Sequence, residues 1–311
     1  MIKDSRINPT KSWQILKDRI LQITDASTGS YSTVIEGFSF HRHINNDDPK
    51  PHFFEPVVII VVQGEKLVKI GVQEYLYGQN ICFISGIDIP VTSCVMKASK
   101  DAPYLAMSLN LDIGLIASLA SKTPILSTPL NTLPRGAMIQ AVEGDLLDAF
   151  LRLIELTEKP EQIPIMKELL LQEIHYRLLS SPFGHTLRAL NTFGSQGNQI
   201  ARVIAWLKNN YKQPLQIEEL AQRSNMAAST FHKHFKDVTS LSPIQYLKQL
   251  RLSEAQYLML SKGYDVTQAA MNVGYESATQ FIREYKRLFG EPPRKNITNI
   301  IKKNEFHSLA Y

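Results

Sequence analysis

Two stretches in the last third of the chain repeat one pattern of apolar and polar positions. The apolar positions with helical spacing in the first stretch are Ile217, Leu220, Ala221, Phe231, Phe235 and Val238. Those in the second stretch are Val266, Ala269, Ala270, Val273, Phe281, Tyr285 and Leu288. Asn225 and Gly274 tolerate the left-handed backbone of a tight turn, and they divide each stretch into two short helices. The pattern therefore predicts two successive helix-turn-helix units between Ile217 and Phe289.

Polar and basic side chains occupy the opposite face of the second helix in each unit. They are Ser229, His232, Lys233 and Lys236 in the first unit, and Thr279, Gln280, Arg283, Lys286 and Arg287 in the second. Such side chains bind phosphates, and glutamine or arginine can discriminate a base edge by about 1–3 kcal/mol for each good pair. We expect Arg283 to read a base, in particular guanine, and the three lysines and Arg287 to hold phosphates. A solvated amphipathic helix is the alternative interpretation of either unit taken alone.

The segment between the two units has the length of a spacer helix. Ser242-Pro243 opens it, because proline is favoured at the first helical position, and the pattern continues from about Ile244 to Leu260. At about 1.5 Å per residue this helix spans roughly 25 Å, which places two DNA-reading helices about one turn of DNA apart. Two patterns with such a spacer predict a protein that reads two adjacent major grooves.

A dispersed set of residues between Leu220 and Arg294 has the order seen in a known family. The set is Leu220-Ala221, Phe231-His-Lys-His-Phe-Lys236, Ser242-Pro243 with Tyr246, Arg251-Leu252 with Ala255, Ala269-Ala270, Val273-Gly-Tyr275, Phe281-Ile-Arg-Glu-Tyr-Lys286, and Phe289-Gly290 with Pro292-Pro293. This stretch resembles the C-terminal domain of AraC/XylS-family transcription regulators. The resemblance implies DNA contacts at Ser229, His232, Lys233, Thr279, Gln280, Arg283 and Lys286. Two positions depart from the family, since Ala227 replaces a serine N-cap and Ser240 replaces a turn glycine.

Charge is distributed unevenly along the 311 residues. From Gln199 to Tyr311 there are 16 lysines and arginines against 9 acidic residues, whereas residues 1–198 hold 18 against 20. A basic C-terminal third beside a slightly acidic remainder is typical of a DNA-binding module joined to another domain. The sequence has no apolar run of membrane-spanning length, no signal-peptide core after Met1, and only two cysteines. We therefore expect a cytoplasmic protein.

The first half of the chain has the short alternating runs of a β domain. Between Ser30 and Leu111, apolar and β-branched runs separated by glycine turns predict strands at 57–63, 67–70, 75–77, 81–84, 91–95 and 104–109. Their spacing predicts a small barrel or sandwich. From about Arg135 the pattern becomes helical, with two amphipathic stripes between residues 138 and 182. We expect these helices to pack on the barrel or to pair with a second chain.

Four segments of this β region have the order of a second known domain. They are Pro56-Val-Val-Ile-Ile-Val-Val-Gln-Gly-Glu-Lys66, Tyr75-Leu-Tyr-Gly78, Ile87-Asp-Ile-Pro-Val91 and Ala102-Pro-Tyr-Leu105. The region resembles the cupin-like N-terminal domain found in one subgroup of AraC-type regulators. The resemblance implies an effector-sensing or dimerising role and leaves the ligand open.

Side chains of the metal-ligand type also occur in the β region. The candidates are His41, His43, His52 and Glu55. His41 and His43 point to the same side of a strand, as two ligands of one metal would. A metal-binding cupin needs a second histidine motif, which residues 78–85 lack. We therefore expect no metal and no other cofactor.

The two cysteines fall in expected strands. Cys82 and Cys94 are most simply small buried hydrophobic residues. The alternative interpretation is that one of them is an effector-sensing thiol, which reacts with an electrophile or oxidant and requires an exposed side chain and a lowered pKa.

Together these patterns predict an α+β protein. Residues 1–195 form a cupin-like sensing or dimerisation domain, with the barrel at about 30–111 and helices at about 138–182. Residues 199–295 form an all-α, AraC-type DNA-binding domain with two helix-turn-helix units joined by a linker helix, and 296–311 form a C-terminal tail.

The predicted function is sequence-specific regulation of transcription, controlled by an effector or stress signal at the barrel, without enzymatic activity. The expected partner is double-stranded promoter DNA, with RNA polymerase, a small-molecule effector and a second copy of the chain as further candidates, and no membrane. Two alternatives stay open at this point. One is a cupin-type metal-dependent enzyme with an accessory helical domain, and the other is a constitutive DNA-binding dimer whose barrel only dimerises.

Overall fold

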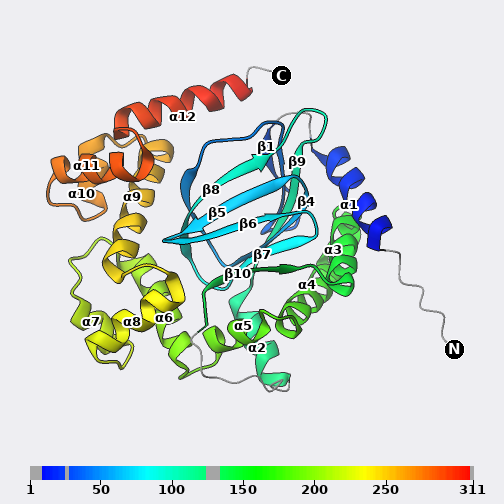
Figure 1. Ribbon diagram of the computed structural model, residues 1–311, viewed down its shortest axis with the longest axis horizontal. Helices are drawn as coiled ribbons and strands as arrows, with labels where there is room; N and C mark the ends of the chain where they lie inside the picture. Colours follow the sequence, from blue (N-terminus) through cyan, green and yellow to red (C-terminus); the bar gives the residue numbers. More distant parts are fainter. Residues whose placement is uncertain (1–8, 25–27, 124–133, 309–311) are drawn as a thin grey trace.

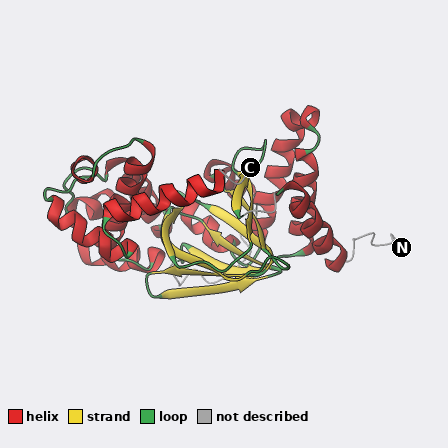
Figure 2. Cartoon of the chain, turned by 90° about the horizontal axis from the view of Figure 1, so that it is seen from above, coloured by secondary structure: helices red, strands yellow, loops and turns green. Residues whose placement is uncertain are grey.

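The structure, a computed structural model, describes residues 9–24, 28–123 and 134–308. A β barrel occupies the middle of the molecule, and helices flank it on two sides (Figure 1). Figure 2 shows the strands between these two groups of helices. In the part of the chain that is described, no helix combines the length and hydropathy needed to cross a bilayer.

The barrel is built from two antiparallel sheets. The larger has the strand order β1-β2-β9-β4-β7-β10, and the smaller has the order β3-β8-β5-β6. The strands are β1 (Gly29–Ser32), β2 (Phe38–His43), β3 (Lys50–Phe54), β4 (Val57–Gln63), β5 (Glu65–Ile70), β6 (Gln73–Gly78), β7 (Ile81–Ser85), β8 (Ile89–Lys97), β9 (Tyr104–Asn110) and β10 (Ala137–Ala141). Each of the six strands expected from the sequence lies within one of these.

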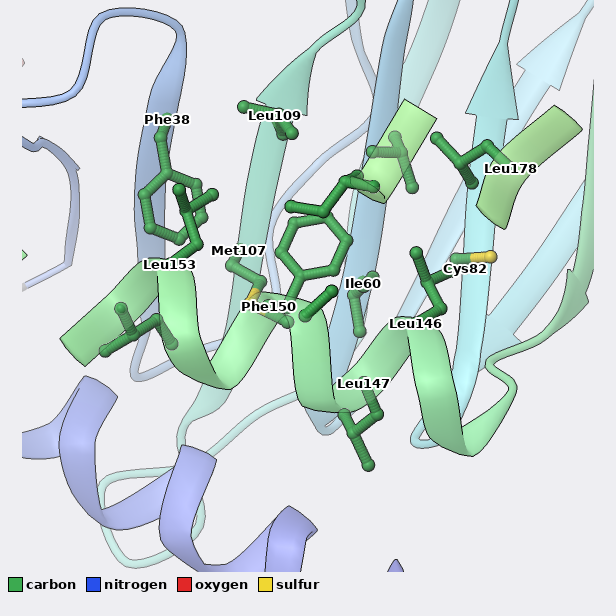
Figure 3. Packing of buried hydrophobic residues seen from close by; sticks show 14 of the residues in the cluster. Phe38, Ile60, Cys82, Met107, Leu109, Leu146, Leu147, Phe150, Leu153 and Leu178 are labelled. Carbon is green, nitrogen blue, oxygen red and sulfur yellow. The ribbon is translucent and has the colours of Figure 1, made fainter. Parts of the chain in front are cut away.

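The larger sheet buries both of its faces, which explains the unbroken apolar run of β4. Val58 and Ile60 belong to a cluster that the N-terminal helices cover, whereas Ile59 and Val61 face the interior of the barrel. In Figure 3 the ring of Phe150 lies against strand residues of the first cluster. The barrel interior is thus closed by the four-stranded sheet on one side and by a helix-backed sheet on the other.

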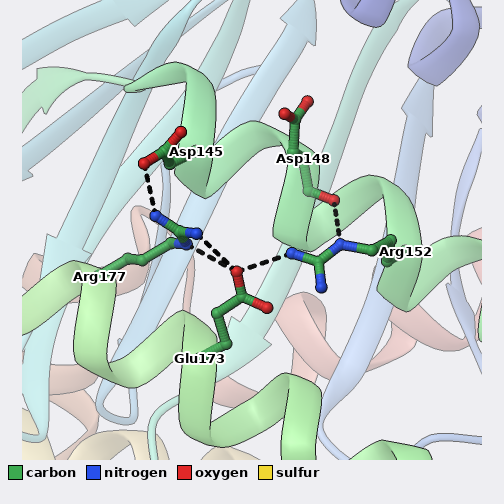
Figure 4. Close-up of polar contacts among 5 residues, drawn as sticks. All are labelled: Asp145, Asp148, Arg152, Glu173 and Arg177. Atoms are coloured by element: carbon green, nitrogen blue, oxygen red, sulfur yellow. Dashed lines mark hydrogen bonds and ion pairs between the residues drawn. The ribbon is translucent and has the colours of Figure 1, made fainter. Parts of the chain in front are cut away.

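Helices of the N-terminal half form the layer behind the larger sheet. They are α1 (Pro9–Ile23), α2 (Ile113–Lys122), α3 (Gly144–Thr157), the short 3-10 helix η1 (Pro160–Gln162), α4 (Ile163–Ser180) and α5 (Gly184–Asn191). Ion pairs join α3 to α4, with Arg177 Nη1 at 2.7 Å from Asp145 Oδ2 and Arg152 Nη2 at 2.7 Å from Glu173 Oε1 (Figure 4). Hydrogen bonds from Arg152 and Arg177 lower the pKa of Glu173.

Among the elements that differ from the sequence-based expectation are β10 and α1. The region expected to be helical from about residue 138 begins with β10, which pairs with β7 and sets Ala137 opposite Ser85. Its sequence has little strand bias, and the free edge of β7 determines its conformation. Helix α1 was not expected, although its buried residues Trp13, Leu16 and Ile20 approximate helical spacing.

The C-terminal half is entirely helical. Its elements are α6 (Gln196–Asn210), α7 (Ile217–Arg223), α8 (Ala228–Thr239), α9 (Pro243–Ser261), α10 (Val266–Asn272), α11 (Ala278–Phe289) and α12 (Pro293–Ser308). The pairs α7–α8 and α10–α11 are the two helix-turn-helix units, and α9 joins them. This arrangement confirms the α+β class expected from the sequence. The residues expected as a tail, 296–311, begin inside α12.

The first helix-turn-helix unit shares its hydrophobic core with the barrel. Phe231 and Phe235 of α8 belong to the same buried cluster as Val61 and Phe83 of the strands, and Tyr246 of α9 belongs to it as well. The second unit has a separate cluster of its own. The domain boundary expected between residues 195 and 199 stays a prediction, and the core is continuous across it.

Polar contacts reinforce this shared core. The Gly136 N–H donates to the carbonyl of Val238 at 2.8 Å, and the Tyr246 hydroxyl donates to the carbonyl of Asp88 at 2.9 Å. Lys208 Nζ lies 2.7 Å from an Asp88 carboxylate oxygen. The position of α8 therefore depends on contacts with the barrel as well as on its own unit.

Candidate nucleic-acid interface

The first helix-turn-helix unit is assembled as its sequence pattern predicts, with a weak point at each end of α8. Asn225, with φ of +51°, makes the turn between α7 and α8, and Phe231 and Phe235 are fully buried beneath α8. Ala227 occupies the N-cap position of α8 and offers no side-chain hydrogen bond. Ser240 ends the helix with φ of +60°, a conformation that glycine adopts more easily. Both departures from the family thus lie at the ends of α8.

The four residues expected to contact DNA from α8 all lie on its exposed face. They are Ser229, His232, Lys233 and Lys236. Within the described residues, neither Lys233 nor Lys236 has a carboxylate within ion-pair distance. Two unpaired ammonium groups are therefore presented to solvent on this face.

The second unit is capped more completely. Asp265 and Gln268 form a reciprocal capping box at the start of α10, and the Ser277 hydroxyl accepts a hydrogen bond from the Gln280 N–H at the start of α11. Gly274 has φ of +86°, and a Cβ there would lie 2.4 Å from the carbonyl oxygen of Lys212. Only glycine fits this turn, because both the backbone conformation and the space exclude a side chain.

The five residues expected to contact DNA from α11 are also exposed. They are Thr279, Gln280, Arg283, Lys286 and Arg287. Gln280 Nε2 donates to Glu284 Oε1 at 3.3 Å, so its amide is partly engaged within the helix. Burial acts to raise the pKa of Glu284, but hydrogen bonds from Lys248, Tyr275 and Gln280 lower it overall. Glu284 therefore stays ionised beside the basic residues and ties α11 to α9.

Helix α9 fixes the two units relative to one another through one arginine. The Arg251 guanidinium donates to the carbonyls of Tyr211, Gln213 and Gly274 at 2.7, 2.8 and 3.2 Å. These carbonyls lie before the first unit and at the turn of the second. The sequence marked Arg251 only by its resemblance to the family, because contacts with backbone some 40 residues away leave no trace in local spacing.

The histidines considered as metal ligands are engaged otherwise. His41 lies between two serine hydroxyls, with Nδ1 at 2.9 Å from Ser30 Oγ and Nε2 at 2.8 Å from Ser108 Oγ. Burial, with a smaller contribution from Lys66, lowers the pKa of His41 to about 3 and that of His52 to about 4. His43 packs edge-on against the Tyr104 ring. Across the described ranges, no three His, Cys, Asp or Glu side chains are grouped to hold a metal ion.

The two thiols have surroundings that favour the protonated form. Cys82 faces the helix layer, and burial raises its pKa to about 12. Burial also raises the pKa of Cys94, whose sulfur lies 3.5 Å from the Met96 sulfur. Neither cysteine has the lowered pKa that a reactive thiol requires.

Comparison with known proteins identifies the family to which this chain belongs. The fold and the exposed basic helices define a helix-turn-helix protein with an N-terminal β barrel. The family models "AraC-type transcriptional regulator N-terminus" and "Helix-turn-helix domain" match residues 34–186 and 220–297. The chain belongs to the AraC/XylS family of transcription regulators.

Two relatives each match part of the chain. The transcriptional activator RhaS of Yersinia pestis (strain Pestoides F) is 31% identical over 99 residues, which is 32% of this chain and 36% of RhaS. The Msm operon regulatory protein of Streptococcus mutans is 25% identical over 162 residues, or 50% of this chain and 56% of the relative. The chain thus matches between about a third and just over half of the length of these relatives.

The fold as a whole resembles a solved structure. ToxT of Vibrio cholerae O395 aligns over 85% of this chain and 98% of its own, with a TM-score of 0.55 and 13% identity. At this identity the likeness establishes the fold alone, namely a barrel followed by two helix-turn-helix units.

Proposed function

We propose that the protein is a sequence-specific DNA-binding regulator of transcription that reads two adjacent major grooves with α8 and α11. The main support for this proposal is that all nine residues expected to contact DNA are exposed on α8 and α11, while the apolar faces of these helices are buried. Helix α9, with the Arg251 contacts, holds the two helices at a set separation. Such paired helices suit two successive grooves on one side of a duplex.

The residues on the two helices would have different roles. Arg283 reads a base edge, because its planar guanidinium can donate two hydrogen bonds to guanine. Lys233, Lys236, Lys286 and Arg287 hold phosphates, which bind any sequence alike. Ser229, His232, Thr279 and Gln280 complete the two contact surfaces.

The barrel would supply control by a small-molecule effector or stress signal. The support is the core that it shares with α8 and α9, because a ligand that moves the strands also changes the packing of a DNA-reading helix. RhaS is named as an activator. By analogy we include RNA polymerase among the proposed partners, in a cytoplasmic setting.

A second copy of the chain is a further proposed partner, through the outer face of α4. Ile165, Leu169 and Tyr176 are exposed there by 70, 54 and 46%. Sedimentation equilibrium tests this proposal with Leu169→Glu and the control Leu76→Glu, whose side chain is equally exposed on the barrel. Only Leu169→Glu should give a monomer, and a wild-type monomer at all concentrations would refute the proposal.

The DNA proposal is tested with the full chain, since α8 depends on barrel contacts. Duplexes selected from a random library are titrated at several salt concentrations. Arg283→Ala should lose about 1–3 kcal/mol of discrimination at one base pair, and Lys286→Ala should weaken all sequences alike and reduce the salt slope by about 1. Lys100→Ala, an exposed lysine in a barrel turn, is the control. Absence of binding at low salt would refute the proposal.

A further inference from the structure

One acidic side chain lies within the DNA-reading helix α11. Glu284 is the only acidic residue between Ala278 and Phe289, and it shares the helix with three exposed basic residues. An acid beside a DNA backbone repels the phosphates, so its presence there calls for a role. The first unit has His234 at the equivalent position of α8, and the acid is therefore particular to the second unit.

Three donors hold the Glu284 carboxylate. Lys248 Nζ of α9 lies 2.9 Å from Oε1, and the Tyr275 hydroxyl donates to Oε2 at 2.8 Å. The third donor is Gln280, whose Nε2 lies 3.3 Å from Oε1. The Glu284 side chain is 15% exposed, and burial raises its pKa less than the three donors lower it. The group is thus a fixed, ionised carboxylate at neutral pH.

This carboxylate determines which way the Gln280 amide is turned. An ionised carboxylate only accepts hydrogen bonds, so the amide nitrogen, and not the oxygen, must face Glu284. Within the described residues, Gln280 Oε1 accepts no hydrogen bond, and the side chain is exposed. One N–H is donated to Glu284, which leaves the second N–H and the carbonyl oxygen for a ligand.

A free N–H beside a free carbonyl oxygen matches one base edge in the major groove. Adenine presents the N7 acceptor and the N6 amino donor there, and a glutamine amide can bond to both. Guanine presents two acceptors, so it would leave the amide oxygen without a donor. Gln280 precedes Arg283 by about 4.5 Å along the helix, against about 3.4 Å for each base pair. The two side chains would therefore reach neighbouring base pairs.

We propose that Glu284 is a positioning residue that holds the Gln280 amide for recognition of adenine, at the base pair next to the one that Arg283 reads. The contacts from Lys248 and Tyr275 keep the carboxylate in place and offset its charge beside the phosphates. An amide that is held before binding loses less entropy when it meets the base. The inference rests on the proposed reading of a major groove by α11, and it names one base and the pair of residues that selects it.

The test changes single atoms of the DNA and uses the full chain. Each adenine of a duplex selected from a random library is exchanged for 7-deazaadenine, which lacks the N7 acceptor but still pairs with thymine. At one adenine this exchange should weaken binding of the wild-type chain about two- to tenfold, the loss of one hydrogen bond. Gln280→Ala, a change at an exposed position, should abolish the effect at that adenine.

A variant of Glu284 separates positioning from a general role in the fold. Glu284→Met has a side chain of similar length that accepts no such hydrogen bond, and it should remove most of the 7-deazaadenine effect. The parallel probe is 7-deazaguanine at the guanine read by Arg283, whose effect should be the same in the wild-type chain and in both variants. Thermal unfolding of each variant is measured, and Glu284→Ala replaces Glu284→Met if the latter does not fold.

The control for lost charge is Glu276→Ala, which removes an exposed acid of the same unit. Removal of either acid lessens repulsion of the phosphates, so both variants should gain affinity for every duplex. Only the Glu284 variant should lose the response to 7-deazaadenine, and Glu276→Ala should keep it.

Three results would overturn the assignment. They are the absence of any adenine whose 7-deaza form weakens binding of the wild-type chain, an undiminished effect in Gln280→Ala or Glu284→Met, and loss of the adenine and guanine effects together in Glu284→Met. The last result would mean that Glu284 only holds α11 in place. As long as the wild-type chain binds the selected duplex, each result rejects the adenine assignment alone, whereas a wild-type chain that binds no duplex at low salt rejects the regulator proposal.

Discussion

At the scale of single residues, the barrel interior combines a charged group with uncharged ones. His41 and His52 are half-buried and neutral at physiological pH, with pKa values lowered to about 3 and about 4. Lys66 keeps a proton at neutral pH because its lowered pKa is still about 8. The barrel therefore carries a positive charge on a half-buried lysine that has no ion-pair partner among the described residues.

Replacing Lys66 by methionine should make the protein more stable at pH 7. The folded pKa of about 8 lies below the ordinary value of 10.5, so the unfolded chain binds more protons between these values. The free energy of unfolding of the wild-type chain should therefore increase as pH rises from about 8 toward 10.5, because folded Lys66 loses its charge in this range. The advantage of Lys66→Met should shrink across the same window.

Urea unfolding of both chains at pH 7 and pH 9.5 measures this difference. Lys69→Met is the matched control, because Lys69 lies on the same strand in an exposed ion pair with Glu74. An advantage that stays constant with pH, or a Lys66→Met chain less stable at pH 7, would contradict the description of Lys66 as a half-buried cation without an ion-pair partner.

At the scale of elements, the two DNA-reading helices differ in how they begin. α11 starts with a hydrogen bond to the Ser277 side chain, whereas α8 starts at Ala227 without one. The Ala227 backbone angles, φ −65° and ψ 148°, nearly match those of Ser242, which caps α9. A serine could therefore cap α8 without any change of backbone.

Ala227→Ser should raise the free energy of unfolding by about 0.5–1 kcal/mol, because its hydroxyl would accept an otherwise unpaired N–H of the first turn. Chemical denaturation measures the change. Ala228→Ser, one position later and equally exposed, is the control and should give no gain. Equal effects of the two substitutions would show that the first turn of α8 does not lack a cap.

Much of this element structure follows from local pattern. Six of the strands β1–β10 and the four helices of the two units have alternation or helical spacing that a single sequence displays. β10 could not be found in this way, because five residues of mixed character pair with β7 only once the barrel exists. The exposed face of each DNA-reading helix was predictable from its apolar stripe. The Arg251 contacts and the Lys66 environment were not, since both join segments distant in sequence.

At the scale of the whole molecule, the barrel and the first unit are packed as one body. Gly71 in a barrel turn has φ of +58°, and a Cβ there would lie 2.4 Å from the carbonyl oxygen of Ser240 at the end of α8. Gly263 has a similar φ of +67° but open space around it. Alanine substitutions at these two glycines therefore distinguish the effect of backbone strain from the effect of contact between the barrel and α8.

Gly71→Ala should loosen the junction between barrel and α8, while Gly263→Ala should not. Both alanines suffer the same strain, but only the first must push the two surfaces apart, at a further loss of about 1–3 kcal/mol. Hydrogen exchange of the amide of Gly136, which bonds Val238, reports the junction. Equal exchange in the two variants would mean that the junction contributes little to the fold.

The central claim, that α8 and α11 occupy adjacent major grooves, is tested most directly by hydroxyl-radical footprinting of the full chain on a selected duplex. Two protected windows should lie on one side of the DNA, with centres about 10–10.5 base pairs apart. Lys233→Ala should weaken only one window and Lys286→Ala only the other. A single window, or protection spread evenly along the duplex, would contradict a reader with two helices.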